Sequence, residues 1–439
     1  MKKILLTTSL LILLLFSCSD NDNEKQIPQS VKYNKFNYQD LEQFSTAMSD
    51  YVDNVNNQVP GTNLNTKEVV FKDVSDVLKS AGFKEEEIYV NVFKISHKIP
   101  RPDLKPGFIT NSAILIVPNK ELIQDPKGIR LVFNAPGAYT ENKEAASLKY
   151  KSIENVFENP ETTPSLAYNP LMAIHGFAML IPDYHGFGDS HNECYFSFDK
   201  DYLCNEFIEL INAGRKILKD EKYTVKDDII ISGYSLGSTS TLPLAKKLDT
   251  DPASNIKMKL VMVGSGILDN IDFAERVKKD ETTGNHLVFP WMVMSNKYNK
   301  YPDLNVNDII QKKYQDITVE YMMTGDKDVY SLLPLIPEKH SDFYAQQFIN
   351  SDSITTDSEY AELYDILNHD STTPWKNKVK IIITHSIYDI TCYYEPMKKF
   401  ADQSKALGGN MIFETTPGEH GLGGLYYYLR LAEELNSNK

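Results

Sequence analysis

The sequence predicts an α/β fold with a mostly parallel central sheet that is covered by helices on both faces. The first observation is a series of short, continuous apolar runs at residues 129–134, 177–183, 228–232, 259–265, 380–385 and 410–416. The second is that stretches with helical patterns separate these runs. Continuous apolar strands that alternate with helices are typical of parallel sheets buried on both faces. Active groups in such sheets gather at the carboxyl ends of the strands, so candidate residues are sought there.

Two further segments flank or interrupt this pattern. Residues 36–86 are predicted to be helical, because apolar residues recur at helical spacing over 36–56 and again near residue 80. A domain spanning residues 87–439 follows, and it opens with a strand pair at 87–99 and 109–118. The strand pattern stops between 265 and 380, which favours a helical cap inserted at about 268–376. A separate C-terminal domain is disfavoured, because two more strands follow the cap.

The first 18 residues have the pattern of a lipoprotein signal peptide. Two lysines precede an apolar run over 4–16 that is too short to span a bilayer permanently. The run ends at Leu15-Phe16-Ser17-Cys18, which resembles a bacterial lipobox with Cys18 as the lipidated residue. An ordinary signal cleaved nearby is the alternative. Residues 19–35 are polar and are predicted to form a flexible tether. We therefore expect an exported cell-envelope lipoprotein that meets the membrane only through its N-terminal anchor.

Composition narrows the partners and cofactors. The chain has 46 Lys and Arg against 60 Asp and Glu, and this net charge of −14 disfavours nucleic acid or anionic membranes as partners. No Cys/His spacing typical of a metal site occurs, and we expect no metal and no other cofactor. In an oxidising compartment Cys194 and Cys204 are expected to form a disulfide. The alternative is that Cys194, Cys204 and Cys392 are small buried apolar residues.

A candidate nucleophile lies in the segment Gly233-Tyr234-Ser235-Leu236-Gly237. This GxSxG pattern directly follows a predicted strand and precedes a stretch that can be helical. Such a setting suits a nucleophile elbow, in which glycines permit a strained turn that lifts the serine out of the sheet. Ser235 is therefore predicted to be the nucleophile.

A serine hydroxyl needs a base to take its proton and an acid to orient that base. His420 is predicted to be the base, because it lies on a glycine-rich loop after the last predicted strand. Asp389 is predicted to be the acid, because it follows the penultimate strand. Asp365 and Asp370 are rivals, but both precede that strand. His385 ends a strand and is interpreted as structural.

The developing oxyanion also needs hydrogen-bond donors. The backbone N–H of Leu236 is one donor by the construction of the elbow. The second donor is predicted to be the backbone N–H of Ala138, in the glycine-containing loop after the strand at 129–134. A plain surface turn is the alternative for that loop.

These segments resemble the α/β-hydrolase superfamily, and more narrowly the secreted bacterial and fungal lipases and esterases that carry a large cap. The resemblance rests on NAPGAY at 134–139, HGFAMLIPDYHGFGDS at 175–190, ISGYSLGS at 231–238, the loop around Asp389 and GEHG at 418–421. The order Ser, Asp, His is that of the superfamily. The resemblance implies that His185, in DYHGFG, shapes the site without doing chemistry. One departure is Pro136-Gly137, where many relatives have His-Gly.

The motifs and the resemblance together predict a serine hydrolase that cleaves carboxylic esters through an acyl-enzyme on Ser235. The expected substrate is an ester of a small molecule, a lipid or an acylated glycan. One alternative is a serine peptidase of the prolyl-oligopeptidase kind, although the residues before 87 are too few for a propeller. Another alternative is a surface-binding lipoprotein that keeps the scaffold without turnover.

Overall fold

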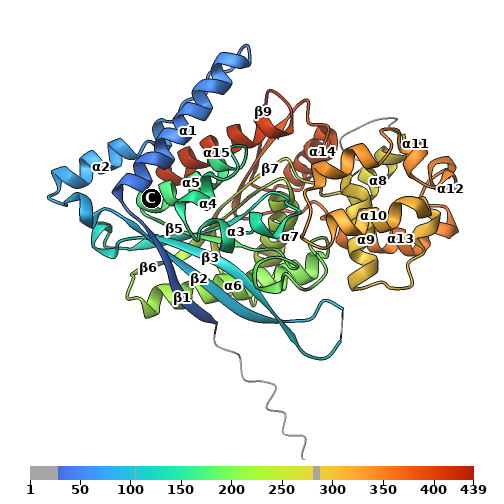
Figure 1. Cartoon of the computed structure of the whole chain (residues 1–439), viewed down its shortest axis with the longest axis horizontal. Coiled ribbons are helices and arrows are strands. Elements are labelled where there is room, and N and C mark those ends of the chain that lie inside the picture. Colours follow the sequence, from blue (N-terminus) through green and yellow to red (C-terminus); the bar gives the residue numbers. More distant parts are fainter. Residues whose placement is uncertain (1–27, 104, 280–286) are drawn as a thin grey trace, which may run out of the picture.

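The computed structural model describes residues 28–103, 105–279 and 287–439, and one sheet runs through its centre (Figure 1). The strands are β1 (Gln29–Phe36), β2 (Val90–Pro100), β3 (Phe108–Pro118), β4 (Ile129–Ala135), β5 (Phe177–Pro182), β6 (Val225–Tyr234), β7 (Lys257–Gly264), β8 (Lys380–Ser386) and β9 (Met411–Thr416). Their order across the sheet is β1-β2-β3-β5-β4-β6-β7-β8-β9. The pairs β1/β2, β2/β3 and β3/β5 are antiparallel, and the other neighbours are parallel. The predicted mostly parallel sheet is confirmed.

Helices cover both faces of this sheet (Figure 1). One face carries α1 (Tyr38–Gln58), α2 (Phe71–Ser80), α5 (Thr163–Ile174) and α15 (His420–Ser437), and the other carries α6 (Lys200–Asp220), α7 (Leu236–Thr250) and α14 (Tyr394–Ala406). Neighbouring residues of β4 show the division, because Leu131 and Phe133 join one apolar core and Val132 joins the other. Both layers of core are therefore supplied by alternate side chains of the same strands.

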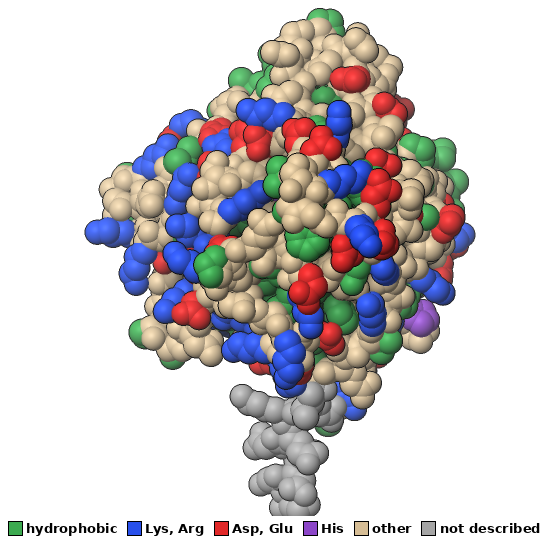
Figure 2. Space-filling view, turned by 90° about the vertical axis from the view of Figure 1, so that its left-hand side faces the viewer, with side chains coloured by type: hydrophobic (Ala, Val, Ile, Leu, Met, Phe, Trp, Pro, Cys, Tyr) green, Lys and Arg blue, Asp and Glu red, His purple; other side chains and the backbone are tan. Residues whose placement is uncertain are grey.

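Shorter helices connect these elements. They are α3 (Ala146–Lys149) and α4 (Ile153–Phe157), with 3-10 turns η1 (Lys67–Val69), η2 (Glu85–Glu87), η3 (Lys120–Leu122), η4 (Asn142–Glu144) and η5 (Gly188–Ser190). None of the helices in the described ranges is long and apolar enough to cross a membrane. Figure 2 views the side of the molecule that lies at the left of Figure 1, and basic and acidic side chains both occur across it. The acidic excess of the chain is thus not gathered into a single patch on that face.

The segment between β7 and β8 forms a helical body at one end of the sheet, opposite α2 (Figure 1). It contains α8 (Asn270–Lys279), α9 (Val288–Asn299), α10 (Lys312–Met322), α11 (His340–Phe343), α12 (Gln346–Asn350) and α13 (Ala361–Asp370), with η7 (Val306–Asp308), η8 (Val329–Leu335) and η9 (Ser358–Tyr360). Its apolar side chains are continuous with the core on the α6 and α7 face. In the described part of this segment no residue belongs to the sheet. We call it the cap below.

The predicted tether is wrong from residue 29 onward, because Gln29–Phe36 forms the edge strand β1. It pairs antiparallel with β2, from Gln29 opposite Ser96 to Phe36 opposite Val90. Most of its side chains are exposed, and only Phe36 is buried. A polar edge strand gains its order from backbone hydrogen bonds, so its low apolar content did not reveal it. The predicted signal peptide, with Cys18, lies outside the described residues.

The expected disulfide is also wrong, because Cys194 and Cys204 are both free. Cys204 lies on α6 and is 2% exposed within the apolar core, where burial raises the pKa of its thiol to about 12. Cys194 lies in the loop after η5, where burial raises its pKa to about 11. The alternative interpretation of small buried residues therefore holds for Cys204, and a short sequence separation did not make the two thiols neighbours.

Candidate active site

The candidate nucleophile stands on a strained turn between β6 and α7. Ser235 has φ +58° and ψ −121°, a conformation that residues other than glycine rarely adopt. A Cβ on Gly233 would lie 2.4 Å from the carbonyl oxygen of Gly237, and one on Gly237 would lie 2.2 Å from that of Ala135. Both glycines are therefore required by close backbone approach. Strain of this kind is typical of functional sites.

His420 faces Ser235 from the first residue of α15. Its Nε2 lies 2.9 Å from Ser235 Oγ. The phenol of Tyr234 donates a hydrogen bond of 2.6 Å to the backbone carbonyl of His420. A Cβ on Gly423 would lie 2.8 Å from that phenol oxygen, so glycine lets α15 approach Tyr234 closely. Tyr234 thus ties the helix that carries the imidazole to the turn that carries the hydroxyl.

Asp389 completes a chain of hydrogen bonds from the loop after β8. Its Oδ2 lies 2.7 Å from His420 Nδ1, and its Oδ1 accepts the N–H groups of Thr391 and Cys392 at 2.9 and 2.8 Å. Burial would raise the pKa of Asp389, but the hydrogen bonds from His420 and from Cys392 N–H outweigh it and lower the pKa. The carboxyl group therefore stays ionised beside the imidazole.

The structure brings Ser235, Asp389 and His420 together and leaves the rival residues elsewhere. Asp370 pairs with His369 and Asp365 is exposed on α13. His385 is buried at the end of β8, and its Nδ1 lies 3.1 Å from the carbonyl oxygen of Ser386. Burial lowers the pKa of His385, so it stays neutral.

One predicted oxyanion donor, Leu236, follows the nucleophile directly in the chain, and the other was predicted on a loop that passes beside it. Leu236 is the first residue of α7, where a helix has N–H groups without intrahelical partners. A Cβ on Gly137 would lie 3.9 Å from Ser235 Cβ, so the loop containing Gly137 and Ala138 passes beside the nucleophile. Ala138 itself is exposed. The loop is placed to offer a donor, and Ala138 stays a prediction for which residue supplies it.

The DYHGFG turn after β5 supports this loop. Tyr184 donates from its phenol to the carbonyl of Pro136 at 2.7 Å, and its backbone N–H donates to the phenol of Tyr139 at 3.1 Å. The neighbouring His185 is 1% exposed, and its Nδ1 lies 3.2 Å from the phenol oxygen of Tyr202. His185 is thus packed in the interior, away from the hydrogen-bonded chain of Ser235.

Burial of His185 has a consequence for stability in acid. Burial lowers its pKa to about 4, whereas an unfolded histidine titrates near 6.5. Between these two pKa values the unfolded chain binds a proton at His185 and the folded chain does not. The full stability of the folded chain is therefore present above about pH 6.5, and part of it is lost as pH falls towards 4. At pH 5 we expect a loss of about 2 kcal/mol in the free energy of unfolding from this residue.

Urea unfolding at pH 7.5 and pH 5.0 measures this loss. His185→Gln should lose less stability between the two pH values than the wild type does. The matched control is His191→Gln, at an exposed histidine near the same turn, which should keep the wild-type loss. An equal loss in His185→Gln and wild type would contradict the assignment.

Tyr234 was missed as a positioning residue by sequence reasoning. Burial raises the pKa of its phenol well above 10, so it remains a donor to His420. Tyr234→Phe should lower kcat by about tenfold with little change in KM, because a lost hydrogen bond of about 1.4 kcal/mol lets the imidazole shift. Tyr223→Phe, which removes a similar bond to the carbonyl of Pro118, is the control and should leave kcat unchanged. A reduced kcat in both variants would indicate a general loss of packing.

Cys392 is a second residue that the sequence did not single out for the site. Its side chain lies against Ser235, and its backbone N–H binds Asp389. Burial raises the pKa of the thiol well above 9, so it stays protonated beside the hydroxyl. Its position three residues after the predicted acid was the available signal.

The sequence and the structure were compared with those of known proteins. No family model and no curated protein matches the sequence. Among solved structures, a provisionally assigned hydrolase of Legionella pneumophila has a TM-score of 0.70 at 14% identity and covers 93% of this chain and 97% of its own. The rice cell wall degrading esterase LipA of Xanthomonas oryzae has 0.65 at 13%, covering 83% and 93%. Candida antarctica lipase A in its closed state has 0.58 at 14%, covering 83% and 80%.

These similarities cover between 83% and 93% of this chain. At 13–14% identity they establish the architecture and leave the chemistry to the residues themselves. The chain has the α/β-hydrolase fold, and its structure is similar to those of an esterase and a lipase.

Proposed function

We propose that this protein is a serine hydrolase that cleaves carboxylic esters through an acyl-enzyme on Ser235. The observation that carries the proposal is the continuous hydrogen-bonded chain from Ser235 Oγ through His420 to Asp389. The three residues follow β6, β8 and β9, so they meet at the carboxyl edge of the sheet. Nucleophile, base and orienting acid in this geometry are the parts that acyl transfer requires.

In the first half-reaction Ser235 Oγ attacks the ester carbonyl carbon while His420 Nε2 accepts its proton. The carbonyl π electrons move to oxygen, and Asp389 stabilises the imidazolium without taking its proton. The N–H groups of Leu236 and of the loop at Ala138 are proposed to bind the oxyanion. When this intermediate collapses, the C–O bond to the alcohol breaks and the departing oxygen takes the proton from His420. An acyl-enzyme remains.

In the second half-reaction water replaces the alcohol. His420 accepts a proton from water as the oxygen attacks the acyl carbon, and the proton then passes to Ser235 Oγ as the bond to serine breaks. The carboxylic acid leaves, and the free enzyme is restored with Ser235 and His420 in their starting protonation states. No cofactor takes part in these steps.

Apolar surroundings support an acyl group as the part of the substrate that the protein holds. Trp291 of the cap stacks on Tyr195 at 4.5 Å between ring centroids, and the backbone N–H of Asn142 donates to Gly325 of the cap at 2.7 Å. The cap therefore packs on the segment that follows the oxyanion loop. On the loop of Asp389, the apolar side chains of Ile387 and Ile390 are 48% and 52% exposed, and Tyr388 between them is 70% exposed. An ester of a lipid, a small molecule or an acylated glycan suits these surroundings.

The test is reaction with a fluorophosphonate probe and with p-nitrophenyl esters from acetyl to long-chain acids. We expect covalent labelling at Ser235 and release of p-nitrophenol, both absent in Ser235→Ala. Acetylated and feruloylated glycans extend the panel to the alcohol side. A folded protein that neither labels nor turns over any ester would overturn the proposal, and cleavage of aminoacyl-proline amides alone would favour a peptidase.

We further propose that Cys18 is lipidated and that the protein is a cell-envelope lipoprotein of a bacterium. The lipobox-like sequence before Cys18 supports this. Expression with an alkyne fatty acid should label the wild-type chain and leave Cys18→Ala unlabelled. Equal labelling of both would overturn the assignment.

A further inference from the structure

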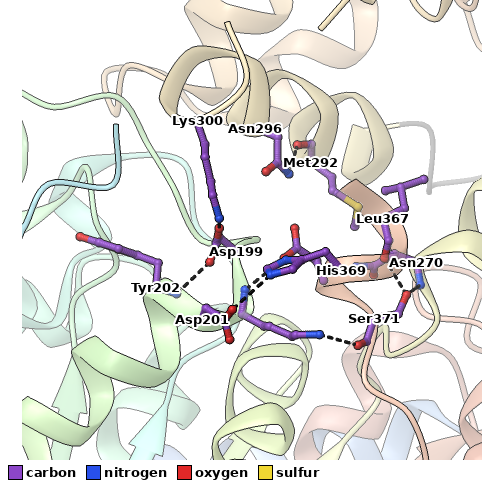
Figure 3. Close-up of polar contacts among 12 residues, drawn as sticks. Asp199, Asp201, Tyr202, Asn270, Met292, Asn296, Lys300, Leu367, His369 and Ser371 are labelled. Atoms are coloured by element: carbon purple, nitrogen blue, oxygen red, sulfur yellow. Dashed lines mark hydrogen bonds and ion pairs between the residues drawn. The ribbon is translucent and has the colours of Figure 1, made fainter. Parts of the chain in front are cut away.

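A cluster of side chains that can ligate a metal lies where the cap meets the sheet domain (Figure 3). Asp199 caps the N-terminus of α6 in the sheet domain, and His369 and Asp370 end α13 in the cap. One ligand atom from each of the three residues lies within 4.8 Å of the others. His369 Nδ1 is 2.8 Å from Asp370 Oδ1. Segments 170 residues apart in the sequence thus converge on one point.

Both carboxyl groups of this cluster are out of water. Asp199 is 2% exposed and Asp370 is 9% exposed. Two carboxylates at this separation repel each other, and burial removes the water that would screen them. The Lys300 ammonium binds Asp199, and the His369 ring contacts Asp370. One lysine therefore faces two buried carboxyl groups.

A separate observation concerns Asn296 on α9. Its side chain is 1% exposed, and its Oδ1 has no hydrogen-bond partner. Asn296 lies four residues before Lys300, so both project from the same side of the helix end, and Figure 3 shows its amide directed from α9 towards the cluster. A buried amide oxygen without a partner is unfavourable unless something binds it. Asn296 therefore brings a buried oxygen without a hydrogen-bond partner to the side of α9 that faces the cluster.

We propose that Asp199, His369 and Asp370, with Asn296 Oδ1, bind one divalent transition-metal ion, with zinc preferred. One imidazole nitrogen together with carboxylate oxygens is a donor set that suits zinc and its neighbours better than calcium or magnesium. Tetrahedral ligands at about 2.0–2.2 Å from zinc lie roughly 3.4 Å apart. The more distant ligand atoms therefore need to close in, and His369 Nδ1 needs to move away from Asp370 Oδ1, which lies at 2.8 Å. His369 is partly exposed, which gives the ion a path of entry.

The remaining contacts of the cluster fit this assignment. His369 Nε2 lies 3.1 Å from Asp201 Oδ2, so a metal on Nδ1 leaves Nε2–H to be oriented by a carboxylate, as is common for metal-bound histidine. The Lys300 ammonium binds Asp199, and its side chain is 23% exposed and can swing outward. Lys300 therefore competes with the ion for Asp199. An ion held here would join α9 and α13 of the cap to α6 of the sheet domain.

Zinc titration of the chelator-treated, full-length protein by calorimetry tests the site, with bound metal counted by mass spectrometry. We expect one zinc per chain and a higher Tm at saturating zinc. His369→Gln should weaken binding by more than about 100-fold, and Asp201→Asn by about 10–100-fold as for the loss of an outer partner. His191→Gln, at an exposed histidine, should bind zinc as the wild type does.

Lys300→Met separates a metal site from a network of ion pairs. If zinc competes with the ammonium for Asp199, this variant should bind zinc more tightly than the wild type and show a larger rise in Tm with zinc. Circular dichroism checks that each variant is folded. Zinc binding that is equal in His369→Gln and wild type, or absent from wild type and Lys300→Met alike, would overturn the proposal. Either result leaves the ester hydrolysis assigned to Ser235 untouched.

Discussion

Replacing Ser235 with alanine is expected to lower kcat for ester hydrolysis by about 10⁶-fold, because no other group on the elbow can form the acyl-enzyme. Loss of the nucleophile in a serine hydrolase costs about as much as loss of the whole triad, since the residues act as a unit. Alanine is nearly the size of serine and carries the same Cβ, so the strain of the turn at φ +58° stays as it is in the wild type. Initial rates on p-nitrophenyl esters, with protein in large excess over any contaminant, measure the effect.

Ser254→Ala is the matched control for this variant. Ser254 lies between α7 and β7, at the end of the sheet away from Ser235, and accepts the backbone N–H of Ile256. Its replacement should leave kcat within a factor of about two, as for a surface change without a special role. Equal rates in Ser235→Ala and wild type would instead favour the alternative of a surface-binding protein that keeps the scaffold without turnover.

Asp389→Asn should lower kcat by about 10⁴-fold. The Asp389 carboxylate accepts a hydrogen bond from His420 Nδ1–H, and this leaves Nε2 free to take a proton from Ser235. An amide in its place can donate to Nδ1, which favours the wrong tautomer of the imidazole. The backbone N–H groups of Thr391 and Cys392 would still hold the side chain in place, so the fold should survive.

The exposed rival acid supplies the control for this prediction. Asp365→Asn on α13 should keep wild-type kcat and KM. Burst kinetics with p-nitrophenyl acetate separate the two half-reactions, and both should slow in Asp389→Asn because His420 serves each. A loss of activity in Asp365→Asn equal to that in Asp389→Asn would contradict the position of the acid.

Local sequence patterns carried the prediction of the sheet and of the residues around Ser235. A GxSxG segment after an apolar strand predicts the tight turn directly, because a side chain at Gly233 or Gly237 would clash with the backbone. His420 and Asp389 could be chosen because parallel strands bring their carboxyl ends to one edge. Order along the chain then selected among several candidates of each type.

Features that depend on long-range pairing were beyond such patterns. The strand Gln29–Phe36 can be polar because backbone hydrogen bonds to β2 hold it in place. Its side chains carry no pattern that predicts this pairing. Cys194 and Cys204 are close in sequence, yet a helix start directs Cys204 into the core. The cluster of Asp199 and His369 has no motif at all, because its members come from separate bodies of the fold.

The helix that begins at His420 is also the last helix of the chain, and its distant end is fastened. Asn436 on its final turn donates to the carbonyl and carboxylate of Glu68 at 3.0 and 2.9 Å. With 18 residues, α15 is a rod of roughly 27 Å whose two ends move together. A purification tag or truncation at the carboxyl terminus that breaks the contacts of Asn436 would therefore make the position of the His420 imidazole, at the other end of α15, less fixed.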